Sequence, residues 1–192
     1  MTGCLTACSS NPTTYEHYVL NSTDNKIEST KNVPAQGKAF VIESVELSRF
    51  LSNAGLVLQT APNKLIISTS HLWAENLDQA IPKTLLKDFQ HLSDDYAFYL
   101  KNHKWLGDDT YHLHLRIDNF HATQSAQVVL SGRYQILKAN RKKQPLVKDF
   151  QFNQALTEDG YQHSVTKMNV LLNYLAEDIL QTVKNHYPPE YN

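Results

Sequence analysis

Cysteine is almost missing from this chain. Only Cys4 and Cys8 occur among the 192 residues, and both lie in the first eight positions. The body of the protein therefore cannot depend on a disulfide framework. A body without cysteine fits either a reducing compartment or a periplasmic protein that avoids disulfides.

Long hydrophobic runs and a large excess of charge are missing as well. No apolar run approaches the ~20 residues that a spanning helix requires, so any membrane attachment must have another origin. The formal net charge is −1, and no aromatic and basic stripe supports binding to nucleic acid. With 41% hydrophobic and 19% charged residues, the composition indicates one globular domain of ordinary size.

Recognisable catalytic motifs are also missing. The sequence holds no G-x-S-x-G element and no phosphate-binding glycine loop, and only six residues are glycine. The acidic pairs Asp94-Asp95 and Asp108-Asp109 fall at positions typical of turns, where Asp bonds to the backbone. We therefore predict no enzyme activity, no catalytic residues and no bound cofactor.

Histidine is the one metal-ligating residue type that clusters. His112 and His114 share one face of a predicted strand, with Asp118 and His121 further along. This spacing is geometrically compatible with a metal site, but it is also typical of the solvent face of an amphipathic strand. Because no fixed pattern completes a coordination sphere, we interpret these side chains as surface and predict no metal.

The N-terminus resembles a lipoprotein processing site. Leu5-Thr6-Ala7-Cys8 has the apolar residue, the small residues and the cysteine of a lipobox, and Met1–Cys4 is a weaker overlapping match. Residues 1–8 are then the remnant of a signal peptide, although only seven residues precede Cys8 instead of a full apolar region. The alternative is an N-terminus without a signal. In the first case Cys8 carries a diacylglycerol and an acyl chain, which together make a stable anchor.

Residues 9–36 are predicted to form a tether with a short edge strand at Tyr18–Leu20, and residues 37–192 form the domain. Turn chemistry at Thr60–Asn63 predicts a hairpin between its two neighbouring strands. The domain strands are expected at Ala39–Leu47, Leu56–Gln59, Leu65–Thr69, Tyr96–Lys101, Thr110–Phe120, Ala126–Lys138 and Pro145–Leu156. Alternating apolar and polar residues in Thr110–Phe120 and Ala126–Lys138 are typical of antiparallel neighbours.

Two helices are predicted from apolar stripes. The first lies between Trp73 and Leu92, and Pro82 requires that it either kinks or begins near Asp78. The second follows Asp159–Gln162, which resembles a capping box, and ends before Pro188. The expected fold is a single α+β domain: a mostly antiparallel sheet with two helices packed on one face.

With these segments in place, the chain resembles the PqiC/YmbA family of ABC-transport auxiliary lipoproteins. No single segment is specific, but their order and spacing together are. The segments are Leu5–Ser10, Tyr18–Leu20, Val45–Leu51, Gly55–Val57, Gln59-Thr60, Leu72–Gln79, Asn119-Phe120, Leu130–Gly132 and Glu158–Tyr161. One departure is Asn76, which stands where the family's Trp-Ala motif usually has proline.

The resemblance implies a non-catalytic accessory subunit of an MCE-type system that moves lipids between the two membranes of Gram-negative bacteria. It implies a periplasmic domain held at the outer membrane through Cys8 and working beside an MCE protein, and it leaves a homo-oligomer open. Ser9 favours outer-membrane sorting, because Asp at this position is the inner-membrane retention signal.

Two alternatives stay open. The domain itself could carry a phospholipid in an apolar groove between helix and sheet, lined by Phe89, Leu92 and the helix stripe. The basic segment Asn140–Lys143 could touch anionic lipid or an acidic partner, although a solvated loop is the more frequent explanation of such a run.

Overall fold

The computed structural model describes residues 14–22, 38–101, 110–138 and 144–189. Its elements in chain order are β1 (Glu16–Tyr18), β2 (Lys38–Leu47), the 3-10 helix η1 (Arg49–Ser52), β3 (Gly55–Ala61), β4 (Lys64–Trp73), α1 (Leu77–Leu92), β5 (Tyr96–Leu100), β6 (Tyr111–Thr123), β7 (Gln127–Lys138), β8 (Leu146–Ala155) and α2 (Tyr161–His186). Each predicted helix and strand is present, and η1 was not predicted. The largest differences are in β1, which begins and ends two residues earlier than expected, and in β4, which continues to Trp73.

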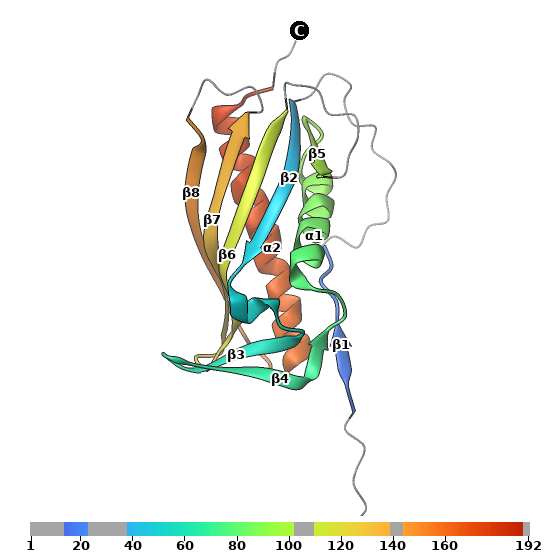
Figure 1. Ribbon diagram of the computed structural model, residues 1–192, viewed down its shortest axis with the longest axis vertical. Coiled ribbons are helices and arrows are strands. Elements are labelled where there is room, and N and C mark those ends of the chain that lie inside the picture. Colours follow the sequence, from blue (N-terminus) through green and yellow to red (C-terminus); the bar gives the residue numbers. More distant parts are fainter. Residues whose placement is uncertain (1–13, 23–37, 102–109, 139–143, 190–192) are drawn as a thin grey trace, which may run out of the picture.

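The strands form one sheet in which β6 is the longest member and pairs along both edges. One edge of β6 pairs with β7, and this pairing is antiparallel as predicted. β7 in turn pairs with β8, also antiparallel. The other edge is shared, because Tyr111–Ile117 pair with β2 and Ala122-Thr123 pair with β3. The sheet therefore divides beyond β6 into a β2–β5 branch and a β3–β4–β1 branch (Figure 1).

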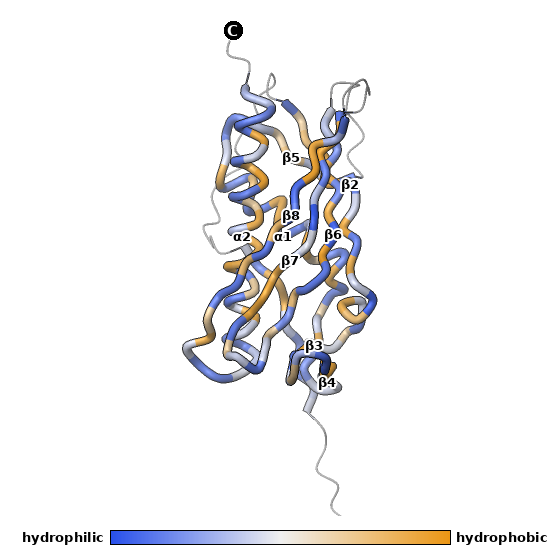
Figure 2. The backbone as a smooth tube through the Cα atoms, turned by 90° about the vertical axis from the view of Figure 1, so that its left-hand side faces the viewer, coloured by the Kyte–Doolittle hydropathy of each residue, from blue (hydrophilic) through white to orange (hydrophobic). Residues whose placement is uncertain are grey.

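Both helices cover the same face of the sheet, as predicted (Figures 1 and 2). In α1 the stripe is buried from Leu77 through Phe89, and Leu92 is partly buried against the core. In α2 the whole predicted stripe is buried: Val165, Met168, Leu172, Leu175, Ile179 and Val183. Since the inward side chains of β6 and β7 meet these stripes, one continuous core lies between the two layers.

The helix starts are only partly as expected. α1 begins at Leu77, where the carbonyl of Asn76 accepts hydrogen bonds from the backbone N–H groups of Gln79 and Ala80, at 3.0 and 2.9 Å. The helix thus begins within one residue of Asp78, and Pro82 lies inside it. The capping box at Asp159 was a wrong prediction. The Asp159 carboxylate accepts from the backbone N–H of Gly160 at 3.0 Å, and no side chain caps α2.

An aromatic cluster closes the end of the domain where α2 finishes. The ring of Phe40 lies 4.9 Å from that of Tyr111 and 5.4 Å from that of Phe98, measured between centroids. Tyr187, which directly follows α2, belongs to the same cluster, and its carbonyl accepts a hydrogen bond from the hydroxyl of Tyr96 at 3.1 Å. Rings packed in this way fill the space between helix and sheet at this end of the domain.

Candidate functional site

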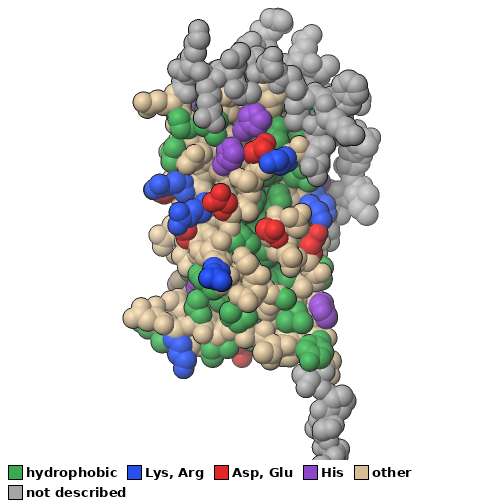
Figure 3. All heavy atoms as spheres, in the orientation of Figure 1, with side chains coloured by type: hydrophobic (Ala, Val, Ile, Leu, Met, Phe, Trp, Pro, Cys, Tyr) green, Lys and Arg blue, Asp and Glu red, His purple; other side chains and the backbone are tan. Residues whose placement is uncertain are grey.

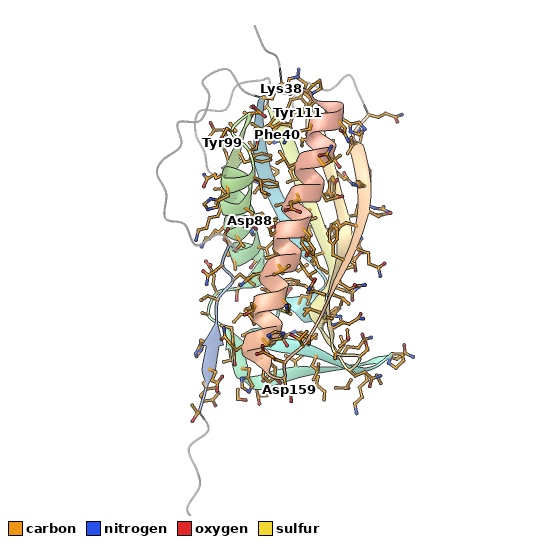
Figure 4. The ribbon with its side chains drawn as sticks, turned by 180° about the vertical axis from the view of Figure 1, so that it is seen from behind. Lys38, Phe40, Asp88, Tyr99, Tyr111 and Asp159 are labelled. Atoms are coloured by element: carbon orange, nitrogen blue, oxygen red, sulfur yellow. The ribbon has the colours of Figure 1, made fainter. Side chains whose placement is uncertain are left out.

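The described chain begins at the opposite end of the domain, which we call the tether end. It comprises β1, the hairpin of β3 and β4, and the start of α2 at Tyr161 (Figure 1). Asp159 marks this end and Lys38 marks the far end, at opposite ends of the long axis (Figure 4). The direction of the incoming chain is fixed by pairing, because β1 runs parallel to β4 and Glu16 pairs with His71. Residues before Glu16 therefore leave toward the side from which β4 arrives.

Polar and aromatic contacts hold β1 in place. The hydroxyl of Tyr18 donates to Oε2 of Glu16 at 2.5 Å and lies 3.0 Å from Nδ1 of His71. The His71 ring stacks on Tyr161 of α2, with centroids 3.9 Å apart. Burial, together with the hydrogen bond to Glu16, raises the pKa of Tyr18 to about 12. The hydroxyl therefore stays protonated and keeps donating at every physiological pH.

A bulge in β4 turns the hairpin away from the body. The register passes from Gly55 opposite Leu72 to Val57 opposite Ile67, so β4 carries extra residues at this point. Bulges bend a strand and increase its twist. Gly55 permits the close approach, because a Cβ at this position would lie 2.0 Å from the Ser68 carbonyl oxygen. The distal hairpin consequently projects beyond the edge of the main sheet (Figures 1 and 3).

The projecting hairpin exposes apolar side chains. Leu65, Ile66 and Ile67 are 37%, 48% and 38% exposed, and Tyr15 next to β1 is 59% exposed. Branched side chains in consecutive strand positions point to both faces of the hairpin. Sequence reasoning identified the hairpin but missed its exposure. The available signal was the run Leu65-Ile66-Ile67, which does not alternate as a half-buried strand should.

A cavity of about 500 Å³ opens between this hairpin and the start of α2. Apolar side chains of β3, β6, α2 and the segment after β8 form much of its wall, among them Leu56, Leu58, Ala122, Leu156 and Met168. Polar groups stand around it at Gln124, Thr157, Glu158 and Asp159. The tether end thus combines an apolar hollow with an apolar projection.

The groove predicted for a phospholipid is not where the sequence suggested. Phe89 is fully buried and stacks on Phe98 with the ring centroids 3.9 Å apart. α1 packs on β2 and β5, and a hollow of about 360 Å³ between these elements is bordered by the charged side chains of Glu43, Lys83 and Lys101. The apolar cavity lies instead at the tether end.

The histidines of β6 do not converge. Nδ1 of His112 lies 3.2 Å from Oε2 of Glu43, whose pKa is lowered by a hydrogen bond from Lys101 and by His112, against the effect of burial. His114 instead faces the hydroxyl of Ser44 at 3.0 Å. Within the described part of the chain, no three His, Cys, Asp or Glu side chains come together as metal ligands.

His121 corrects the interpretation of this strand as one continuous solvent face. Its side chain is 3% exposed, its ring lies 6.1 Å from that of Phe50 in η1, and burial lowers its pKa. A register shift between Ile117 and Asn119 changes which residues face inward. The unpredicted helix η1 then covers the outer face at this point.

The sheet face without helices is polar and internally neutralised. Arg133 of β7 donates to Asp149 of β8 from Nε at 2.5 Å and from Nη2 at 3.0 Å. This guanidinium holds the pKa of Asp149 below its usual range. A second ion pair joins Arg116 to Asp118 at 2.9 Å. Figure 3 shows such acidic and basic side chains close together on this face.

Several predicted features lie outside the described residues, among them the lipidation site Cys8, the acidic pair Asp108-Asp109 and the basic segment Asn140–Lys143. The first described residue, Thr14, follows Cys8 by six positions. Among the described residues, no helix has both the length and the apolar character needed to cross a membrane.

Comparison with known proteins identifies the family. Residues 18–180 match the family of ABC-type transport auxiliary lipoprotein components. The chain belongs to this family. The domain boundaries at residues 8 and 36 remain predictions, since the match begins at Tyr18, inside the predicted tether.

Named relatives support the family assignment. The intermembrane transport lipoprotein PqiC of Escherichia coli (strain K12) is 26% identical over 181 residues, which cover 94% of this chain and 92% of that protein. PqiC of Shigella flexneri matches equally. The predicted family, that of auxiliary lipoprotein components of ABC-type transport, is confirmed by these matches.

Solved structures show the same fold. The crystal structure of an uncharacterized protein has a TM-score of 0.73 and 22% identity, covering 88% of this chain and 99% of the other. A Xanthomonas campestris protein has a TM-score of 0.66 and 12% identity, covering 88% and 94%. The predicted single α+β domain is therefore confirmed.

Proposed function

We propose that this protein is a non-catalytic accessory subunit of an MCE-type intermembrane lipid transport system. A diacylglycerol and an acyl chain on Cys8 anchor it to the periplasmic face of the outer membrane, where it works beside an MCE protein. The single observation that carries this proposal is the family match over residues 18–180. The E. coli relative is named an intermembrane transport lipoprotein, which supports a role in transport between the two membranes.

The arrangement of the domain is consistent with an anchored adaptor. Parallel pairing of β1 with β4 brings the chain in at one end of the long axis, so that the other end is held away from the anchor (Figure 1). Tethering raises the local concentration at the membrane, and contacts with a partner can then be individually weak. Repeated copies on one membrane would also favour a homo-oligomer.

Replacement of Cys8 by alanine tests the anchor. In a Gram-negative host that exports the chain, we expect Cys8→Ala to move the protein from the outer-membrane fraction to the soluble periplasm. The reason is that each buried CH2 contributes about 0.8 kcal/mol, so loss of two or three chains abolishes stable anchoring. Membrane fractionation and the mass of the N-terminal peptide are the measurements, with co-purification of an MCE protein as the readout of partnership.

The matched control is Cys4→Ala, which removes the other thiol and should leave localisation unchanged. Retention of Cys8→Ala in the outer-membrane fraction would contradict the anchor. Loss of localisation in Cys4→Ala would assign the anchor to the other cysteine.

A second function has a specific observation in its favour. The apolar cavity of about 500 Å³ at the tether end is large enough for part of a lipid, and a carrier would need such a space. Native mass spectra of the Cys8→Ala protein separate the two functions. A bound phospholipid would favour the carrier, and its absence would favour the adaptor.

A further inference from the structure

We propose that the distal β3–β4 hairpin, residues 57–67, contacts the lipid surface to which the protein is tethered. The inference rests on the proposed function for the orientation of the domain. The surface concerned consists of Leu65, Ile66 and Ile67 on the hairpin, with Lys64 beside the turn.

Chain length places this surface near the bilayer. The six residue steps from Cys8 to Thr14 span at most about 20 Å even when fully extended. β1 and the hairpin lie at the same end of the long axis, and the hairpin projects to the side away from β1 (Figure 1). A lipid on Cys8 therefore turns the tether end of the domain, which includes the hairpin, toward the headgroups.

The chemistry of the hairpin suits a lipid interface. Three large apolar side chains are between 37% and 48% exposed in consecutive positions of one strand. No acidic residue occurs between Glu46 and Glu75, whereas Arg49 and Lys64 are basic. Apolar side chains beside a cation favour the boundary between headgroups and acyl chains, above all where anionic lipid is present.

The backbone of the hairpin limits how deep it can enter. β4 pairs with β1 only at His71–Trp73, so among the described residues no strand covers the outer edge of Lys64–Ser70. Unpaired N–H and C=O groups cannot enter the hydrocarbon without a large cost. The contact is consequently interfacial, with side chains in the acyl boundary and the strand edge among hydrated headgroups.

The other described surfaces fit lipid less well. The helix-free face carries the ion pairs Arg133–Asp149 and Arg116–Asp118. Val147 on β8 is 47% exposed, but it stands in a strand with Lys148 and Asp149. Val147 therefore provides a matched reference position, since its exposure of 47% is close to the 48% of Ile66 but no contact with lipid is expected there.

A tethered protein tests the contact without depending on acylation in the cell. The full chain with Cys4→Ser is coupled through Cys8 to maleimide lipid in vesicles of phosphatidylethanolamine and phosphatidylglycerol. Ile66→Trp and Ile67→Trp report from the two faces of the hairpin, and Val147→Trp is the control. The emission of Trp73 and Trp105 is subtracted using the parent chain.

We expect phosphatidylcholine with brominated acyl chains to quench the tryptophans at 66 and 67 at least about twofold more than the one at 147. Equal quenching at the three positions would overturn the proposal. A blue shift of the fluorescence emission of the tryptophan at 66 that grows with protein concentration without lipid would assign the surface to a second copy of the chain. A blue shift that only an MCE protein causes would assign it to that partner. Either result would overturn the proposal as well. Maleimide coupling supplies the lipid without acylation in the cell. The Cys8→Ala fractionation tests the anchor of the proposed function, whereas this experiment tests only the hairpin, so either result can be negative while the other is positive.

Discussion

Replacing Gly132 by alanine is expected to disrupt the centre of the sheet. Gly132 of β7 pairs with Ile117 of β6, directly at the register shift of that strand. An added Cβ would lie 2.0 Å from the carbonyl oxygen of Arg116 and 3.0 Å from Cα of Ile117. Both are backbone atoms that cannot turn away, so the two longest strands would have to separate.

The expected loss of unfolding free energy for Gly132→Ala is at least the upper end of the ~1–3 kcal/mol that overpacking usually costs. Urea denaturation followed by circular dichroism measures it. Gln135→Ala, on the same strand and partly exposed, is the control and should stay within about 0.5 kcal/mol. A stable, cooperative Gly132→Ala protein would show that β6 and β7 are not paired in this register.

Replacing Phe89 by alanine is expected to cost about 3–5 kcal/mol of unfolding free energy. The ring is fully buried and lies almost parallel to Phe98 of β5, at 9° and 3.9 Å. Truncation would leave a cavity that the surrounding residues of α1 and the sheet fill only partly. The same denaturation experiment measures the effect.

Tyr174→Ala serves as the matched aromatic control for Phe89. Tyr174 on α2 is 39% exposed and meets Phe152 only edge-on, with centroids 6.5 Å apart. Its removal should cost about 1 kcal/mol. Equal losses of unfolding free energy for the two substitutions would contradict the position of α1 against β5. The hypothesis of a lipid groove beside Phe89 would then have to be considered again.

Helices, strands and turns that depend on residues close together in the sequence were predictable. The stripes of α1 and α2 repeat at helical spacing, and β6 and β7 alternate, because a secondary structure in contact with a core must place apolar side chains at its own period. The β3–β4 hairpin was predictable from its turn residues Pro62 and Asn63. The family resemblance was equally readable, since it depends on the order of segments along the chain.

Pairings between distant segments were not predictable. The parallel pairings of β2 with β5 and β6 join residues far apart in sequence, and no turn motif in the sequence indicates them. The burial of His121 depends on a one-residue shift in β6 and on η1 folding over it. A shift of one residue reverses the faces of a strand, and periodicity alone does not locate it.

The candidate site likewise has one property that the sequence determined and others that only the tertiary structure decided. The sequence by itself determined the composition of the hairpin: consecutive apolar residues, one lysine and no carboxylate over a long stretch. Only the tertiary structure decided that these side chains face solvent and that they share an end with the incoming chain. The physical reason is that exposure results from what packs against a residue, and packing is set by the bulge of β4 and the parallel docking of β1.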